Sequence, residues 1–119
     1  MASGAFGGLQ EGAGARLVLT TAPDAATAER IARALVDERL CACATVLPGA
    51  TSIYRWQGAV ESASECQLVV KCSEAVLERL VARLAALHPY ELSECVVLEP
   101  RQVESRYAAW ILEQCDPAP

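Results

Sequence analysis

The chain has 119 residues, of which 53% are hydrophobic, and it carries a formal net charge of −5 at pH 7. This length predicts one domain, and the apolar content is enough to fill its core. A protein that holds nucleic-acid phosphates needs a basic face, so the acidic balance argues against nucleic acid as a partner.

Residues 1–15 are rich in glycine and alanine and lack both a basic start and a continuous apolar stretch. They therefore resemble neither a signal peptide nor a membrane span. We expect a flexible leader over residues 1–15, no membrane partner and a cytoplasmic location.

Residues 17–21 form a short apolar run that is typical of a buried strand. Pro23 stops this run, and Asp24 can then cap a helix by accepting a hydrogen bond from the Thr27 N–H. Apolar residues follow at helical spacing, which predicts a helix that covers one face of a sheet: Ala28, Ile31, Ala32 and Leu35.

Residues 41–71 predict a long antiparallel hairpin. Residues 51–56 are rich in β-branched and aromatic side chains, and Gln57-Gly58 offers a two-residue turn. Residues 66–72 alternate between apolar and other side chains, while Pro48-Gly49 indicates a bulge or bend. Each arm exceeds the usual ~5–6 residues. We therefore expect the tip to project from the domain and to lie against another subunit.

A second amphipathic helix follows, for which Ser73 is the expected cap and Pro89 the stop. Residues 94–99 predict a strand. A third short helix without a clear cap is marked by an apolar stripe: Val103, Tyr107, Trp110 and Ile111. Residues 116–119 are expected to be a frayed tail.

The predicted order is strand, helix, hairpin, helix, strand and extra helix. This is the α+β, ferredoxin-like βαββαβ sandwich, here with a long projecting hairpin and an additional C-terminal helix, in a single domain over residues 16–115. Right-handed crossovers place both main helices on one face of a four-stranded antiparallel sheet. The other face needs a cover, which the third helix or a neighbouring chain can supply.

Six cysteines are many for this length. Four of them fall inside apolar strand patterns: Cys43, Cys66, Cys72 and Cys95. The sequence contains no C-x-x-C pair, which would indicate a zinc ribbon or a redox site. We interpret the cysteines as buried, reduced thiols of a cytosolic protein.

His88 is the single histidine and begins the segment His-Pro-Tyr-Glu, which ends at Glu91. Such a segment between a helix and a strand suits a binding function, because loops often carry binding residues. The alternative is that His88 only terminates the helix. Cys41 or Cys43 with His88 and Glu91 would be the one set available to a hydrolase, and no nucleophile-elbow, Walker or HExxH pattern is present. We expect no catalytic activity.

Tyr54 and Trp56 lie two residues apart on one strand and therefore point to the same side. With Lys71 in the same ladder they could frame an aromatic and cationic pocket for a small anion. The alternative is that these residues pack in an interface between subunits.

Several short motifs together resemble the CutA divalent-cation tolerance family, over about residues 17–113: Ala42-Cys43-Ala44-Thr45, Pro48, Ser52-Ile53-Tyr54, Trp56, Gly58, Glu65, Lys71, His88-Pro89-Tyr90-Glu91 and Glu94. The resemblance implies a ferredoxin-like subunit, a homotrimer similar in architecture to the PII signalling proteins, and a link to copper and other divalent cations. It implies no established catalysis and no tightly bound cofactor. By position, His88 is the residue most like a family metal ligand, whereas Thr20 and Leu87 stand where some members have cysteine and histidine.

Two function classes follow. One is a metal-responsive trimer that binds Cu²⁺ or Zn²⁺ at His88 and Glu91. The other is a PII-like module that binds a small molecule or a protein partner in a cleft between subunits beside Tyr54, Trp56 and Lys71.

Overall fold

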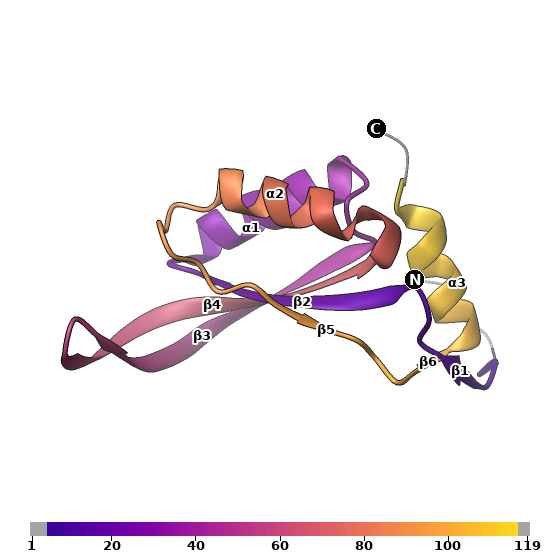
Figure 1. Cartoon of the computed structure of the whole chain (residues 1–119), viewed down its shortest axis with the longest axis horizontal. Helices are drawn as coiled ribbons and strands as arrows, with labels where there is room; N and C mark the ends of the chain where they lie inside the picture. Colours follow the sequence, from indigo (N-terminus) through magenta and orange to yellow (C-terminus); the bar gives the residue numbers. More distant parts are fainter. Residues whose placement is uncertain (1–4, 117–119) are drawn as a thin grey trace.

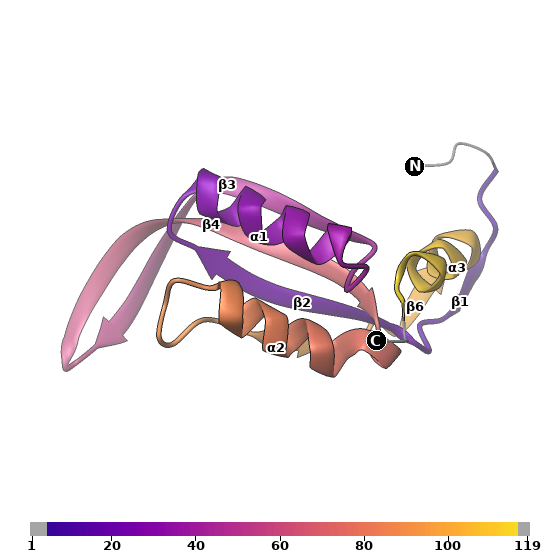
Figure 2. The same cartoon turned by 90° about the horizontal axis from the view of Figure 1, so that it is seen from above.

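The computed structural model describes residues 5–116. Its centre is a four-stranded antiparallel sheet with the strand order β3-β4-β2-β5. Both long helices cover one face of this sheet, as Figures 1 and 2 show. The elements of this unit are β2 (Ala15–Ala22), α1 (Ala25–Asp37), β3 (Cys43–Trp56), β4 (Ala59–Ser73), the short 3₁₀ turn η1 (Glu74–Val76), α2 (Leu77–Leu87) and β5 (Val96–Leu98). This arrangement confirms the ferredoxin-like prediction.

The main core lies between the sheet and the two helices. The alternation predicted in β4 is confirmed, because Cys66, Leu68, Val70 and Cys72 are all buried and point toward the helices. Helix α1 contributes its apolar stripe, and α2 contributes Leu80 and Leu84. The opposite face of β4, which carries Gln67, Val69 and Lys71, is only half-buried.

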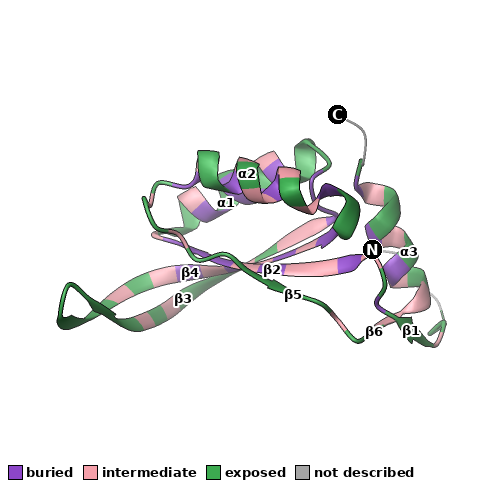
Figure 3. Ribbon diagram, viewed as in Figure 1, coloured by how far each residue is buried: buried purple, intermediate pink, exposed green. Residues whose placement is uncertain are grey.

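The hairpin of β3 and β4 has the turn and the bulge that the sequence predicts. Gln57 and Gly58 both have positive φ, 48° and 82°, as a type I′ turn requires. The register shifts between Leu47 and Ala50, where Gly49 has a φ of +80°. The outer half of the hairpin projects from the domain and is mostly exposed (Figure 3).

The two main helices begin differently. The Asp24 carboxylate accepts the Thr27 N–H at 2.7 Å, which confirms the predicted cap and lowers the pKa of Asp24. The predicted Ser73 cap is wrong. Ser73 is buried in the end of β4, and its side chain makes no capping hydrogen bond, because the 3₁₀ turn of Glu74–Val76 separates it from α2.

A smaller unit stands at the other end of the molecule from the hairpin tip (Figure 1). It contains β1 (Leu9–Glu11), β6 (Gln102–Glu104) and α3 (Ser105–Gln114), and β1 pairs antiparallel with β6. The sequence prediction contained neither strand. Val103, Tyr107, Trp110 and Ile111 pack there against Ala15 and Ala42 in a second small core.

Both chain ends differ from the expectation where they are described. Residues 9–11 form a strand within the segment predicted to be a flexible leader, and residues 1–4 lie outside the described residues. Asp116, the first residue of the predicted frayed tail, donates its N–H to the Arg39 carbonyl at 3.0 Å, while residues 117–119 again lie outside.

All six cysteines are free, although their positions differ in part from the prediction. Cys66 and Cys72 are buried in β4, Cys43 is half-buried in β3, and Cys95 is exposed, just before β5. Within residues 5–116, none of the helices is long and apolar enough to cross a membrane.

Candidate functional site

His88 lies at the point where α2 ends and the chain turns toward β5. Pro89 forces an extended backbone on His88, whose φ and ψ are −78° and 134°. Its N–H donates to the Leu84 carbonyl at 2.9 Å and closes the last turn of the helix. The sequence alternative that His88 terminates the helix is therefore part of its role.

Both ring nitrogens of His88 are engaged. The Tyr90 N–H donates to Nδ1 at 3.1 Å, so Nε2 carries the proton and donates it to the Thr21 carbonyl at 2.6 Å. The side chain is only 8% exposed. The imidazole thus joins the end of α2 to the end of β2, and the nitrogen that holds a lone pair is Nδ1.

Tyr90 of this segment hydrogen-bonds to a carboxylate of another element, Glu65 of β4. The Tyr90 hydroxyl donates to Glu65 Oε2 at 2.9 Å, and the Tyr90 ring lies 4.9 Å from the His88 ring, measured between centroids. Desolvation by burial and this hydrogen bond raise the pKa of Tyr90 to about 12. Glu91 is exposed.

Sequence reasoning did not identify Glu65 as a site residue. Glu65 lies opposite Ala50, directly after the bulge, where β4 is still part of the sheet. Pro48-Gly49 predicted the bulge, but the sequence did not show that Glu65 of β4 lies across from the residue that follows it.

Gln67, two residues further along β4, extends the polar cluster. Its side-chain amide donates to the Thr20 carbonyl at 2.9 Å and lies 3.3 Å from a carboxylate oxygen of Glu94. Sequence reasoning did not identify Gln67. Within residues 5–116, the structure contains no group of three or more His, Cys, Asp or Glu side chains placed to hold a metal ion.

The three residues predicted to frame a cleft do not meet within one chain. Trp56 pairs with Ala59 next to the turn, whereas Lys71 pairs with Cys43 near the other end of β4. At ~3.4 Å per residue, this separates Trp56 from Lys71 by about 40 Å. Lys71 instead lies over the ring of Tyr107, with Nζ 5.7 Å from the centroid, and the Tyr107 hydroxyl is 3.6 Å from Cys43 Sγ.

Exposed apolar side chains gather at the hairpin tip and along β5. At the tip, Ile53 is 72% exposed and Val60 is 65% exposed. Tyr54 and Trp56, which lie between Ile53 and the turn, are also exposed. On the edge strand β5, all three residues, Val96, Val97 and Leu98, are exposed.

Comparison with known proteins identifies relatives of this chain. The family model described as CutA1 divalent ion tolerance protein matches residues 16–114. The divalent-cation tolerance protein CutA of Thermus thermophilus is 44% identical over 97 residues, which is 82% of this chain and 94% of that protein. The protein of the same name from Pectobacterium atrosepticum is 41% identical over 95 residues, 80% of this chain and 86% of that protein.

Solved structures agree in fold. The crystal structure of CutA from Xylella fastidiosa is 42% identical, with a TM-score of 0.85, and the match covers 87% of this chain and all (100%) of that chain. CutA from Synechococcus elongatus is 37% identical with a TM-score of 0.87, covering 92% and 96%. A protein from Archaeoglobus fulgidus that is described as a periplasmic divalent cation tolerance protein is 26% identical with a TM-score of 0.82, covering 86% and 99%. This chain belongs to the CutA1 family of divalent ion tolerance proteins.

Proposed function

We propose that this chain acts in the tolerance of divalent cations as a homotrimer that binds Cu²⁺ or Zn²⁺ weakly. The observation that supports this proposal most directly is the family match over residues 16–114 at 41–44% identity to the curated relatives. The proposal of metal binding and the proposal of a trimer rest on different parts of the structure.

The proposed metal ligands are Nδ1 of His88 and the carboxylate of Glu91. Histidines that bind metals commonly donate their other ring N–H to a backbone carbonyl, which fixes the tautomer and the orientation of the ring. His88 has this arrangement, because Nε2 donates to the Thr21 carbonyl. A mixed set of imidazole and oxygen donors suits Zn²⁺ and Cu²⁺.

The present hydrogen bond to Nδ1 explains why binding should be weak. A metal ion would have to displace the Tyr90 N–H, and a lost hydrogen bond costs on the order of 1 kcal/mol. One histidine also leaves most of the coordination sphere to oxygen donors or to a neighbouring copy. We expect a Kd in the micromolar range or weaker.

The proposed assembly buries the apolar surface of the hairpin tip and the half-buried sheet face. A two-stranded ribbon is marginally stable alone in water, and this one exposes Ile53, Tyr54 and Trp56. Contiguous exposed apolar surface of this kind marks a protein–protein contact.

The test is a calorimetric titration of Cu²⁺ and Zn²⁺ into the parent protein and the His88→Ala and Glu61→Gln variants, with the mass checked by light scattering. His88→Ala should lose most of the binding and keep the mass of the parent. Glu61→Gln, a change of an exposed carboxylate on the hairpin, should bind like the parent. Unchanged Cu²⁺ binding by His88→Ala would remove His88 from the proposed site and leave it with its structural role.

A further inference from the structure

The N-terminal arm, defined here as residues 5–14, is built onto the family fold. It lies before residue 16, where the family match begins. Its strand β1 pairs with β6 from Leu9–Glu104 to Glu11–Gln102, and the two strands make a separate sheet (Figure 1). Among the described residues, β1 is the one strand that pairs with β6.

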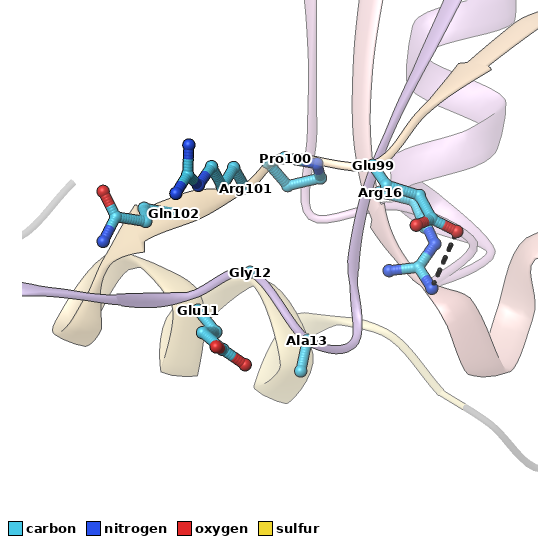
Figure 4. A pocket seen from close by; sticks show the side chains of 8 residues that line it. All are labelled: Glu11, Gly12, Ala13, Arg16, Glu99, Pro100, Arg101 and Gln102. Atoms are coloured by element: carbon cyan, nitrogen blue, oxygen red, sulfur yellow. Dashed lines mark ion pairs between the residues drawn. The ribbon is translucent and has the colours of Figure 1, made fainter.

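The arm has a fitted seat on the chain that links β5 to β6. The Gly12 N–H donates to the Arg101 carbonyl at 3.1 Å, and a Cβ at residue 12 would lie 2.1 Å from the Pro100 carbonyl oxygen. No residue other than glycine can approach this closely. A pocket of about 360 Å³ separates the arm from Glu99 and Arg16 beside this contact (Figure 4).

The beginning of the arm is held by the start of α3. The Ser105 N–H donates to the Gly8 carbonyl at 2.9 Å, and the Ser105 hydroxyl donates to the Gly7 carbonyl at 2.8 Å. The Gly7 N–H donates to the Glu104 carboxylate at 2.6 Å.

Strand β6 is also held from its other side, independently of the arm. Val103 packs in the small core with Ala15, Ala42 and Ile111. The Glu104 carboxylate accepts the N–H groups of Arg106 and Tyr107 and so caps α3. If the arm left its seat, β6 would therefore keep its position and present an open edge.

The pairing of β1 itself is small. The strand has three residues, all of them exposed, and Leu9 is 59% exposed. Its side chains bury little apolar surface, so the pairing depends on backbone hydrogen bonds and on the seat of Gly12.

We propose that the arm blocks the edge of β6 against pairing with an extended strand of a second copy. An exposed strand edge presents unpaired N–H and C=O groups to any other chain, and proteins commonly cover such edges. Val103 and Glu104 hold β6 in place, and the arm supplies its partner strand within the same chain.

The test compares three full-length variants with the parent by light scattering over a range of concentrations. Gly12→Val places side-chain atoms against the Pro100 carbonyl and should unseat the arm. Leu9→Pro combined with Gln10→Pro removes the pairing of β1 with β6 directly. Successive N–H groups of a strand point to opposite sides, so one of the two must face β6, and proline has no N–H to donate. Ala13→Val changes an exposed neighbour of Gly12 and is the matched control.

Both arm variants should form larger species whose mass is at least about twice that of the parent assembly, since each new pairing joins two assemblies. Ala13→Val should keep the parent mass. Hydrogen exchange checks the release of the arm directly, through faster exchange of the amides of residues 9–11. Faster exchange with an unchanged mass in both arm variants would overturn the proposal. The mass of the parent protein tests the trimer separately.

Discussion

At the scale of single residues, two polar side chains each join elements that are distant in the sequence. His88 connects the end of α2 to β2 through Thr21 and to its own loop through Tyr90. Glu104 caps α3 and also holds the N-terminal arm through Gly7. Because each side chain accepts or donates several hydrogen bonds to backbone groups, its loss affects more than one element.

Glu104 gives the residue-scale prediction. Hydrogen bonds from the backbone N–H groups of Gly7, Tyr107 and Arg106 lower its pKa from the ordinary value of 4.5 to about 2. A lowered pKa stabilises the fold at pH values above the ordinary value, and this stabilisation is lost as the pH falls through the folded value. We expect Glu104→Gln to lower the Tm at pH 7.

The pH dependence separates this effect from a general loss of packing. The difference in Tm between parent and Glu104→Gln should be constant above about pH 5 and should shrink as the pH falls toward about 2. Thermal unfolding followed by circular dichroism measures both. A difference that stays the same down to pH 2 would show that the charge of Glu104 is not the cause.

At the scale of elements, the hairpin of β3 and β4 is the feature that most needs a partner. Its inner half belongs to the sheet, where β4 is half-buried or buried and β3 exposes Thr45 and Leu47, while its outer half, beyond the bulge at Gly49, is mostly exposed. The type I′ turn fixes the register, so the apolar side chains at the tip keep a defined orientation for contact.

The element-scale prediction concerns assembly. Ile53→Asp combined with Val60→Asp places two charges on the tip without touching the core, because both side chains are exposed in the single chain. The parent should have about three times the 12.7 kDa mass of one chain at micromolar concentration, and the variant should have a lower mass.

A matched control is Val36→Asp, which changes an exposed apolar residue on α1 away from the hairpin tip. It should keep the parent mass. A parent that is monomeric by light scattering, or a tip variant with the parent mass, would contradict the assembly proposed for the hairpin.

At the scale of the whole molecule, the described residues form one large core and one small core. The large core lies under α1 and α2 and contains Cys41, Cys66, Cys72 and Cys115, while the small core lies under α3. Mainly because they are buried, Cys41 and Cys72 have pKa values raised to about 12. Thiols of this kind behave as small apolar side chains and react slowly.

The whole-molecule prediction follows from this burial. A thiol reagent at pH 8 should modify Cys43 and Cys95 before the four buried cysteines, and all six should react once the protein is denatured. Mass spectrometry of the modified peptides identifies the order. Recovery of only four reactive thiols under denaturant would indicate a disulfide and contradict the assignment of six free cysteines.

The sequence predicted well those features that depend on local chemistry. Asp24 caps α1 because a carboxylate lies three residues before the N–H that it accepts, and the turn at Gln57-Gly58 depends on a residue that tolerates positive φ. The apolar alternation of β4 and the ferredoxin-like order follow from periodicity in the same way.

The sequence could not predict features that depend on pairing between distant segments. β1 and β6 are too short and too polar to show a strand pattern, and each forms a strand because of the other. Likewise the Tyr90 hydroxyl, in the segment between α2 and β5, contacts Glu65 of β4. The carboxylate that the sequence indicated for this site, Glu91, is exposed instead. The metal ligands His88 and Glu91, the trimer and the cytoplasmic location stay predictions.

The position of β2 also constrains how the polypeptide can be made. Val18 of this strand pairs with Val70 on one side and with Val97 on the other. During synthesis from the N-terminus, β2 leaves the ribosome long before either partner, whereas β3 and β4 follow one another directly and can pair early through their turn. Contacts between distant segments form slowly, and unpaired strands are prone to aggregate. The four-stranded sheet is therefore completed only when β5 has emerged, so the first strand of this sheet to be synthesised is the last to acquire both of its neighbours.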